Sequence, residues 1–113
     1  MAYLVVNNGA CFLDGAINDS QTSIGIKDAT PTLTVALSSV SASSPLLLTI
    51  DNDTNVEIVK VTAHNAGTLT VERGIDGTVA LAFADNVKAE ARMNRELVND
   101  IKNASIINAI IYG

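Results

Sequence analysis

Apolar and polar residues alternate most regularly in the middle of the chain, over residues 57–78. The residues that share one face there are apolar: Val59, Val61, Ala63, Leu69 and Val71. A period of two in runs rich in Val, Ile and Thr predicts two half-buried strands, at residues 57–63 and 68–73. Between them, Asn65 and Gly67 favour the positive φ angles of a tight turn. The pattern therefore predicts a β-hairpin, around which the rest of the chain is organised.

A second sharp turn is expected directly after this hairpin. Glycines stand at both of its ends and an aspartate inside it, and these residue types favour reversals of the chain. The predicted structural turn comprises Arg73, Gly74, Asp76 and Gly77. A third strand is expected to begin at Thr78.

Shorter strands are predicted along the rest of the chain. Leu33, Val35 and Leu37 alternate with more polar neighbours, which predicts a strand at residues 32–37. The apolar run at residues 46–50 predicts a strand that is buried on both faces. Further strands are expected at residues 3–6, 10–13, 22–26 and 87–92. The serine-rich residues 38–44 are expected to form a loop or linker.

The pattern changes to a helical period near the end of the chain. Asn94 can cap a helix, and Leu97, Val98 and Ile101 then share one stripe, which predicts a helix at residues 94–105. Residues 106–113 are too apolar for a chain end in water. This tail is expected either to pack on its own sheet or to contact another subunit, and we favour the subunit contact. The predicted contact residues are Tyr3, Leu4, Val5, Ile106, Ile107, Ile110, Ile111 and Tyr112.

Length and composition define the expected fold. A chain of 113 residues is long enough for one domain and too short for two. Because only 4% of the residues are aromatic and none is Trp, the core must consist of Val, Ile, Leu and Ala. We predict a mainly β domain, a small antiparallel β-sandwich or barrel with one short C-terminal helix.

Charge and apolar patterning restrict the possible partners. A formal net charge of -5 repels phosphate groups, so a nucleic-acid partner is not expected. The longest uncharged span, residues 29–50, is interrupted by Pro31 and Pro45 and rich in Ser and Thr, so no membrane crossing is expected. The first residues do not resemble a signal peptide. A soluble protein that is made and kept, or assembled, inside a cell is expected.

Candidate catalytic and metal-binding residues are few. Cys11 is the only cysteine and is expected to be a small core residue. His64 is the only histidine, and no nucleotide-binding or nucleophile-elbow motif occurs. Asp51 and Asp53 lie in an acidic stretch that could suggest a calcium loop, but the glycine and glutamate that an EF-hand requires are absent. We expect no enzyme, no cofactor and no metal, and we expect these acidic residues to cap a turn.

Several of these runs resemble a β-rich module of bacteriophage virion structural proteins, found in tail, fibre, baseplate and decoration-type proteins. The matching runs are EIVKVTA at residues 57–63, GTLTVERG at 67–74, the Gly77-Thr78 pair, the apolar residues 79–84 and the alternating residues 18–27. The likeness covers most of residues 15–101. The pair Arg73-Gly74, in register with Gly77-Thr78, is its most distinctive part. Arg73 is hypothesised to hold turn carbonyls or acidic side chains.

The resemblance implies a non-enzymatic subunit on the surface of a phage particle, assembled in the host cytoplasm. Because the chain carries no fibre, it suggests a capsid decoration (cement) protein bound to the major capsid protein. A tail, baseplate or tail-fibre adaptor is the close alternative. A homo-oligomer such as a trimer is expected, held by strand-edge pairing and by apolar contacts. A carbohydrate-binding module is a weaker alternative, because its aromatic platform would have to come from Tyr3, Phe12, Phe83 and Tyr112.

Overall fold

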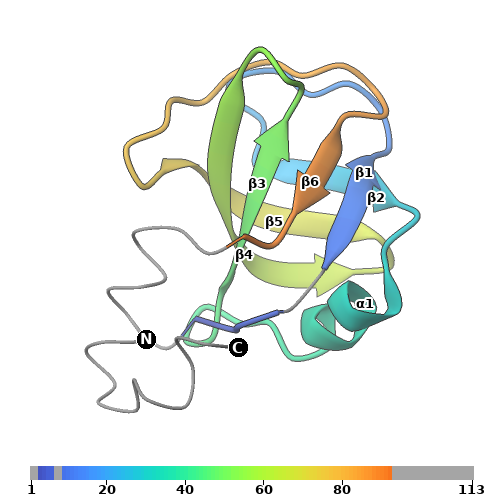
Figure 1. Cartoon of the computed structure of the whole chain (residues 1–113). Helices are drawn as coiled ribbons and strands as arrows, with labels where there is room; N and C mark the ends of the chain where they lie inside the picture. Colours follow the sequence, from blue (N-terminus) through green and yellow to red (C-terminus); the bar gives the residue numbers. More distant parts are fainter. Residues whose placement is uncertain (1–2, 7–8, 93–113) are drawn as a thin grey trace.

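The described chain folds into one closed, antiparallel β-barrel of six strands in the order β1-β2-β5-β4-β3-β6 (Figure 1). The structure is a computed structural model that describes residues 3–6 and 9–92. Its strands are β1 (Ala10–Leu13), β2 (Ser23–Lys27), β3 (Leu46–Asp51), β4 (Val56–Asn65), β5 (Thr68–Ile75) and β6 (Lys88–Glu90). The predicted mainly β fold is confirmed, in its barrel form. The helix predicted at residues 94–105 and the tail 106–113 lie outside the described residues.

The predicted central hairpin is present as β4 and β5. Its strands are longer than expected, because Asn65 still pairs with Thr68 across the turn. Only Ala66 and Gly67 remain in the turn, and both have positive φ angles, of 51° and 83°. Two such residues make the tight turn whose twist matches that of the flanking strands. The register of β4 against β5 also shifts twice, and such irregularities help a sheet to bend into a barrel.

Aliphatic side chains fill the interior of the barrel. All six strands contribute to it, and α1 and two loops add to its ends. The prediction that residues 46–50 are buried on both faces is confirmed, because Leu46, Leu48 and Ile50 join the main core while Leu47 packs with Ile58 in a second cluster. A six-stranded barrel is narrow enough for such side chains to fill it. The barrel interior is thus a packed core.

The strand predicted at residues 32–37 is wrong, because these residues form the helix α1 (Pro31–Leu37). The side chain of Thr30 caps the helix by accepting a hydrogen bond from the backbone N–H of Leu33, and Pro31 has the φ angle that a first helical residue needs. Leu33 and Leu37 lie four residues apart and are buried, whereas Val35 is 70% exposed. In Figure 1 the helix lies at the end of the barrel next to the N-terminal segment.

Two further strand predictions are corrected. Residues 3–6 form an extended segment that is outside the sheet, and the N–H of Leu4 donates to the carbonyl of Pro45 (2.8 Å). Residues 78–82 are loop, and the expected third strand is reduced to one isolated bridge between Ile17 and Phe83. β6 is also shorter than the predicted strand at residues 87–92.

Within the described ranges, no helix combines the length and apolar composition that crossing a membrane requires.

Closure of the barrel changes the expected mode of association. Each of the six described strands is hydrogen-bonded to a neighbour on both sides, because β1 pairs with β6. A closed sheet offers no row of unpaired backbone groups to another chain. The expected strand-edge pairing between subunits therefore has no free edge among the described strands.

Thr30 supports two elements at once and provides a test of the helix assignment. Its hydroxyl accepts from the N–H groups of Ala10 (3.1 Å) and Leu33 (3.4 Å), so it joins the start of β1 to the start of α1. We predict that Thr30→Ala lowers the free energy of unfolding by about 1–2 kcal/mol, measured by urea denaturation. Thr30→Ser retains the acceptor and should stay close to the original protein. Equal stability of the Ala and Ser variants would contradict this role.

Candidate functional site

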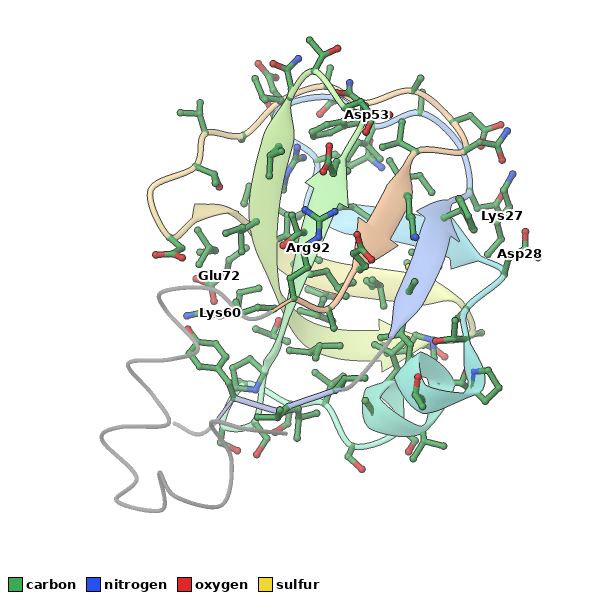
Figure 2. All side chains as sticks on the ribbon, viewed as in Figure 1. Lys27, Asp28, Asp53, Lys60, Glu72 and Arg92 are labelled. Atoms are coloured by element: carbon green, nitrogen blue, oxygen red, sulfur yellow. The ribbon has the colours of Figure 1, made fainter. Side chains whose placement is uncertain are left out.

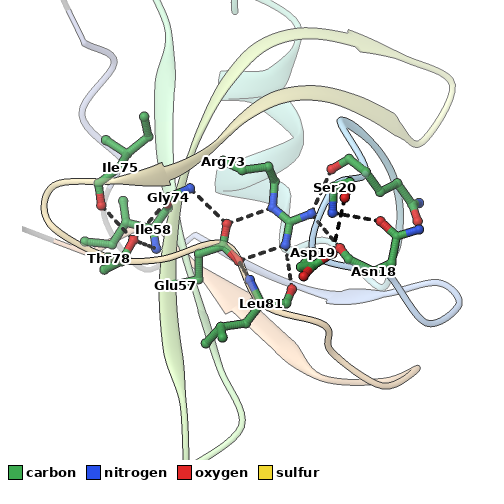
Figure 3. A network of polar contacts seen from close by, with 11 residues as sticks. Asn18, Asp19, Ser20, Glu57, Ile58, Arg73, Gly74, Ile75, Thr78 and Leu81 are labelled. Carbon is green, nitrogen blue, oxygen red and sulfur yellow. Dashed lines mark hydrogen bonds and ion pairs between the residues drawn. The ribbon is translucent and has the colours of Figure 1, made fainter.

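The most concentrated polar arrangement in the described chain is a buried ion pair between Glu57 of β4 and Arg73 of β5 (Figure 3). The pair is bidentate, because Arg73 Nε donates to Glu57 Oε2 (2.7 Å) and Nη2 donates to Oε1 (2.8 Å). The Glu57 side chain is 0% exposed and that of Arg73 is 7% exposed. Burying two charges is costly unless their hydrogen bonds are complete.

The hydrogen bonds of this pair are complete. Besides its bonds to Glu57, Arg73 donates to the carbonyls of Asn18 (2.8 Å), Gln21 (2.8 Å) and Leu81 (2.6 Å), so all five of its N–H groups are used. Each oxygen of Glu57 accepts one further backbone bond, from the N–H of Gly74 (3.0 Å) or Leu81 (2.8 Å). The pair therefore connects two strands and two loops.

The protonation state of Glu57 follows from these contacts. Burial by itself would raise the pKa of the carboxyl group. The hydrogen bonds from Arg73, Leu81 and Gly74 and the positive charge of Arg73 outweigh burial and place the pKa below its ordinary value. Glu57 is thus held as a carboxylate whose lone pairs are occupied. Such a group stabilises the fold and is poorly suited to accept a proton from a substrate.

The predicted turn residues build the loop that covers this pair. Gly74 has a φ angle of 61°, and a Cβ atom there would lie 3.2 Å from backbone atoms of both Thr78 and Ala80. Asp76 and Gly77 also have positive φ angles, of 56° and 81°. The hydroxyl of Thr78 donates to the carbonyl of Ile75 (2.7 Å) and accepts from the N–H of Ile58 (3.0 Å). These residues return the chain so that Leu81 reaches the ion pair.

The acidic stretch that begins at the last residue of β3 caps a turn. One oxygen of Asp51 accepts from the N–H of Asp53 (2.8 Å), and the other accepts from Arg92 (3.1 Å). The side chain of Asn52 accepts from the N–H groups of Thr54 and Asn55. Asp51 is therefore already engaged by internal donors. Among the described residues, no group of three or more His, Cys, Asp or Glu side chains is placed to hold a metal ion.

The single cysteine and the single histidine both have structural surroundings. Cys11 is fully buried in the core, and burial raises the pKa of its thiol to about 12. A thiol of this kind stays protonated and is a weak nucleophile. His64 lies at the end of β4, where its Nε2 accepts from the N–H of Gly67 (3.1 Å) in the hairpin turn.

An apolar groove lies between the N-terminal extended segment and α1. Its volume is about 540 Å³, and it is open to the surface. The lining residues are Leu4, Val5, Val6, Pro31, Thr32, Val35, Ala36 and Ser39. It contains two of the predicted contact residues, Leu4 and Val5. Tyr3 lies outside the groove, with the ammonium of Lys60 5.8 Å from the centre of its ring. The five predicted contact residues of the tail are outside the described residues.

Sequence reasoning named Arg73 and its neighbours but missed the groove. The sequence pattern predicts a strand at residues 32–37 and a loop at residues 38–44, and neither prediction places these residues opposite residues 4–6. The signal that could have revealed the groove is the Thr30-Pro31 pair, which marks a helix start. Together with the spacing of Leu33 and Leu37, it would have left Val35 on the outer face.

The ion pair makes a direct prediction for substitutions at Arg73. Removing one partner of a buried pair leaves the other charge uncompensated, so Arg73→Ala should lower the free energy of unfolding by about 3–5 kcal/mol in urea denaturation. Arg73→Lys keeps the charge but cannot donate two parallel hydrogen bonds to the carboxylate of Glu57, so this variant should also be destabilised. The control is Lys27→Ala, which breaks the exposed pair between Lys27 and Asp85 (3.4 Å) and should have little effect. Equal midpoints for Arg73→Ala and Lys27→Ala would refute the structural role.

A pH dependence follows from the lowered pKa of Glu57. Because the folded protein binds this proton less tightly than the unfolded chain, the pair contributes stability above the ordinary Glu pKa of about 4.3. That contribution is lost as the pH falls from there through the folded pKa. The pKa values of Asp51, Asp85 and Glu90 are also lowered, so the stability that these carboxylates contribute is likewise lost on acidification. The stability difference between the original protein and Glu57→Gln should shrink on acidification. A constant difference in urea titrations between about pH 7 and about pH 3 would contradict this.

Comparison with known proteins adds no relative to this geometry. No protein-family model matches the chain, and no curated protein matches its sequence.

Proposed function

We propose that this chain is a non-enzymatic structural subunit of a bacteriophage particle, and that it serves as a capsid decoration (cement) protein. The observation that carries the proposal is the role of the residues behind the resemblance to phage virion modules. Glu57, Arg73, Gly74 and Thr78 all take part in one internal network that fixes the barrel wall. The residues that carry the resemblance therefore serve to hold the fold together. Residues with such a role suit a structural subunit of a particle.

The surroundings of the charged side chains support a non-enzymatic role. The buried Glu57 and Arg73 have their hydrogen bonds occupied by each other and by backbone groups. Charged side chains such as Lys27, Asp53 and Glu72 are spread over the outside of the barrel in Figure 2. Catalysis needs acid, base or nucleophile groups that converge on one cleft. The groove between residues 4–6 and α1 is instead lined almost entirely by apolar groups.

The apolar tail is the proposed site of assembly. Residues 106–113 include four isoleucines and Tyr112, a composition that favours contact with another protein. Because the described strands leave no free sheet edge, we propose that apolar contacts supply the affinity, multiplied over many copies. The proposed partners are copies of this chain, in a trimer or another closed ring, and the major capsid protein.

Two other functions make different predictions. A tail, baseplate or tail-fibre adaptor would use the same scaffold and tail but would bind at few positions of the particle. A carbohydrate-binding module would need exposed aromatic rings on one face. Phe83 is only 3% exposed and Phe12 36% exposed, and Tyr3 contacts Lys60, so the described aromatic residues do not form such a platform.

Copy number tests the proposal. We expect quantitative mass spectrometry of purified phage particles to find this chain at a level comparable with the major capsid protein. A few copies per particle would replace the decoration role with the tail or baseplate role. Absence from the particle would overturn both.

Deletion of residues 106–113 tests the proposed assembly site. The shortened chain should keep its barrel, as judged by circular dichroism, and fail to enter particles. The matched control is Val79→Gln, a change at an exposed residue outside the tail and the groove, which should enter normally. Normal incorporation of the shortened chain would show that assembly uses another surface.

A further inference from the structure

The apolar groove exposes more hydrophobic surface than its position next to the core explains. Val35 is 70% exposed and Val5 is 51% exposed, and they lie on opposite walls, one on α1 and one on the N-terminal segment. These are two of the five large apolar residues that are exposed in the described chain. Contiguous apolar surface of this kind usually marks a place where another element packs.

The chain leaves the described region beside this groove. The N–H of Ala91 donates to the carbonyl of Gly9 (2.8 Å). A Cβ atom on Gly9 would lie 2.6 Å from Val6, 3.4 Å from Leu33 and 3.6 Å from Ala91. Val6 lines the groove and Leu33 belongs to α1, so the end of β6 is fixed at the base of both walls. The described chain, which ends at Arg92, therefore ends within a few residues' reach of the groove.

The next residues of the sequence have the complementary character. Residues 94–105 carry the predicted helical stripe of Leu97, Val98 and Ile101, on a helix that would be about 18 Å long. A groove between an extended segment and a helix suits the apolar face of an amphipathic helix. The short connection from Arg92 gives this segment a high effective concentration, so it should bind ahead of the same segment from another copy.

We propose that residues 94–105 pack as a helix into the groove of their own subunit, with the stripe against Val5 and Val35. The groove then belongs to the core of the complete subunit, and Leu4 and Val5 are covered within it. The outer contact falls to residues 106–112 alone. This inference does not depend on the proposed role in a phage particle and would hold for the isolated protein.

A matched pair of substitutions tests whether the groove is covered. Val35 and Val79 are almost equally exposed in the described chain, at 70% and 69%, but only Val35 lines the groove. Gln favours a helix at least as well as Val, so Val35→Gln does not weaken α1 by itself. We expect Val35→Gln to lower the melting temperature of the full chain by about 4–8 °C. Val79→Gln should leave the melting temperature unchanged, and equal values for the two variants would overturn the proposal.

Disulfide trapping in the full chain then identifies the occupant. Val35→Cys is combined in turn with Leu97→Cys, Val98→Cys and Ile101→Cys, while the buried Cys11 serves as an unreactive internal reference. At least one pair should form an intramolecular disulfide under mild oxidation, detected by mass spectrometry and non-reducing electrophoresis. The control is Val79→Cys with the same partners, which should not form one. A disulfide-linked dimer would assign the groove to a second copy of the chain. If no disulfide forms, residues 94–105 do not occupy the groove. Either result would overturn the proposal.

Discussion

The buried ion pair between Glu57 and Arg73 is the constraint on which the rest of the structure depends. Two charges removed from water are tolerable only while every one of their hydrogen bonds is made. The carbonyls of Asn18, Gln21 and Leu81 and the N–H of Gly74 must therefore stay in place. The pair thereby ties two loops, which the bridge between Ile17 and Phe83 also joins, to β4 and β5. The loops become parts of the barrel wall.

The apolar core of the barrel and the ion pair make different contributions to the structure. The interior is filled by aliphatic side chains, whose burial stabilises the fold but does not depend on the direction of the contacts. The bidentate ion pair adds hydrogen bonds of defined geometry at one place. A filled interior also means that any partner must bind on the outside. In the described chain the apolar groove beside α1 is such an outer surface. The proposed role as a particle subunit uses the outside of the molecule alone.

Periodicity predicted the parts of the fold that depend on local pattern. The hairpin and β2 follow from alternation, because each of these strands has one face against the core, whereas β3 follows from a continuous apolar run that is buried on both faces. The pattern of Leu33, Val35 and Leu37 predicted a strand where the chain forms α1. Apolar residues at every second position include a pair that is four residues apart, here Leu33 and Leu37, and a helix can bury such a pair on one face. The partners of Arg73 could be named only by class. Glu57 is 16 residues away, and the three carbonyls are backbone groups that carry no signature in the sequence.

The closing pair of strands has a consequence for synthesis. β1 begins at Ala10 and its partner β6 ends at Glu90, so the strands that complete the barrel are made almost at opposite ends of the described chain. Contacts between such distant residues form slowly, because a long loop must close before they contribute. The barrel cannot close until Glu90 has left the ribosome. Until then the aliphatic face of β1 lacks its closing partner, and exposed apolar strands of this kind favour aggregation.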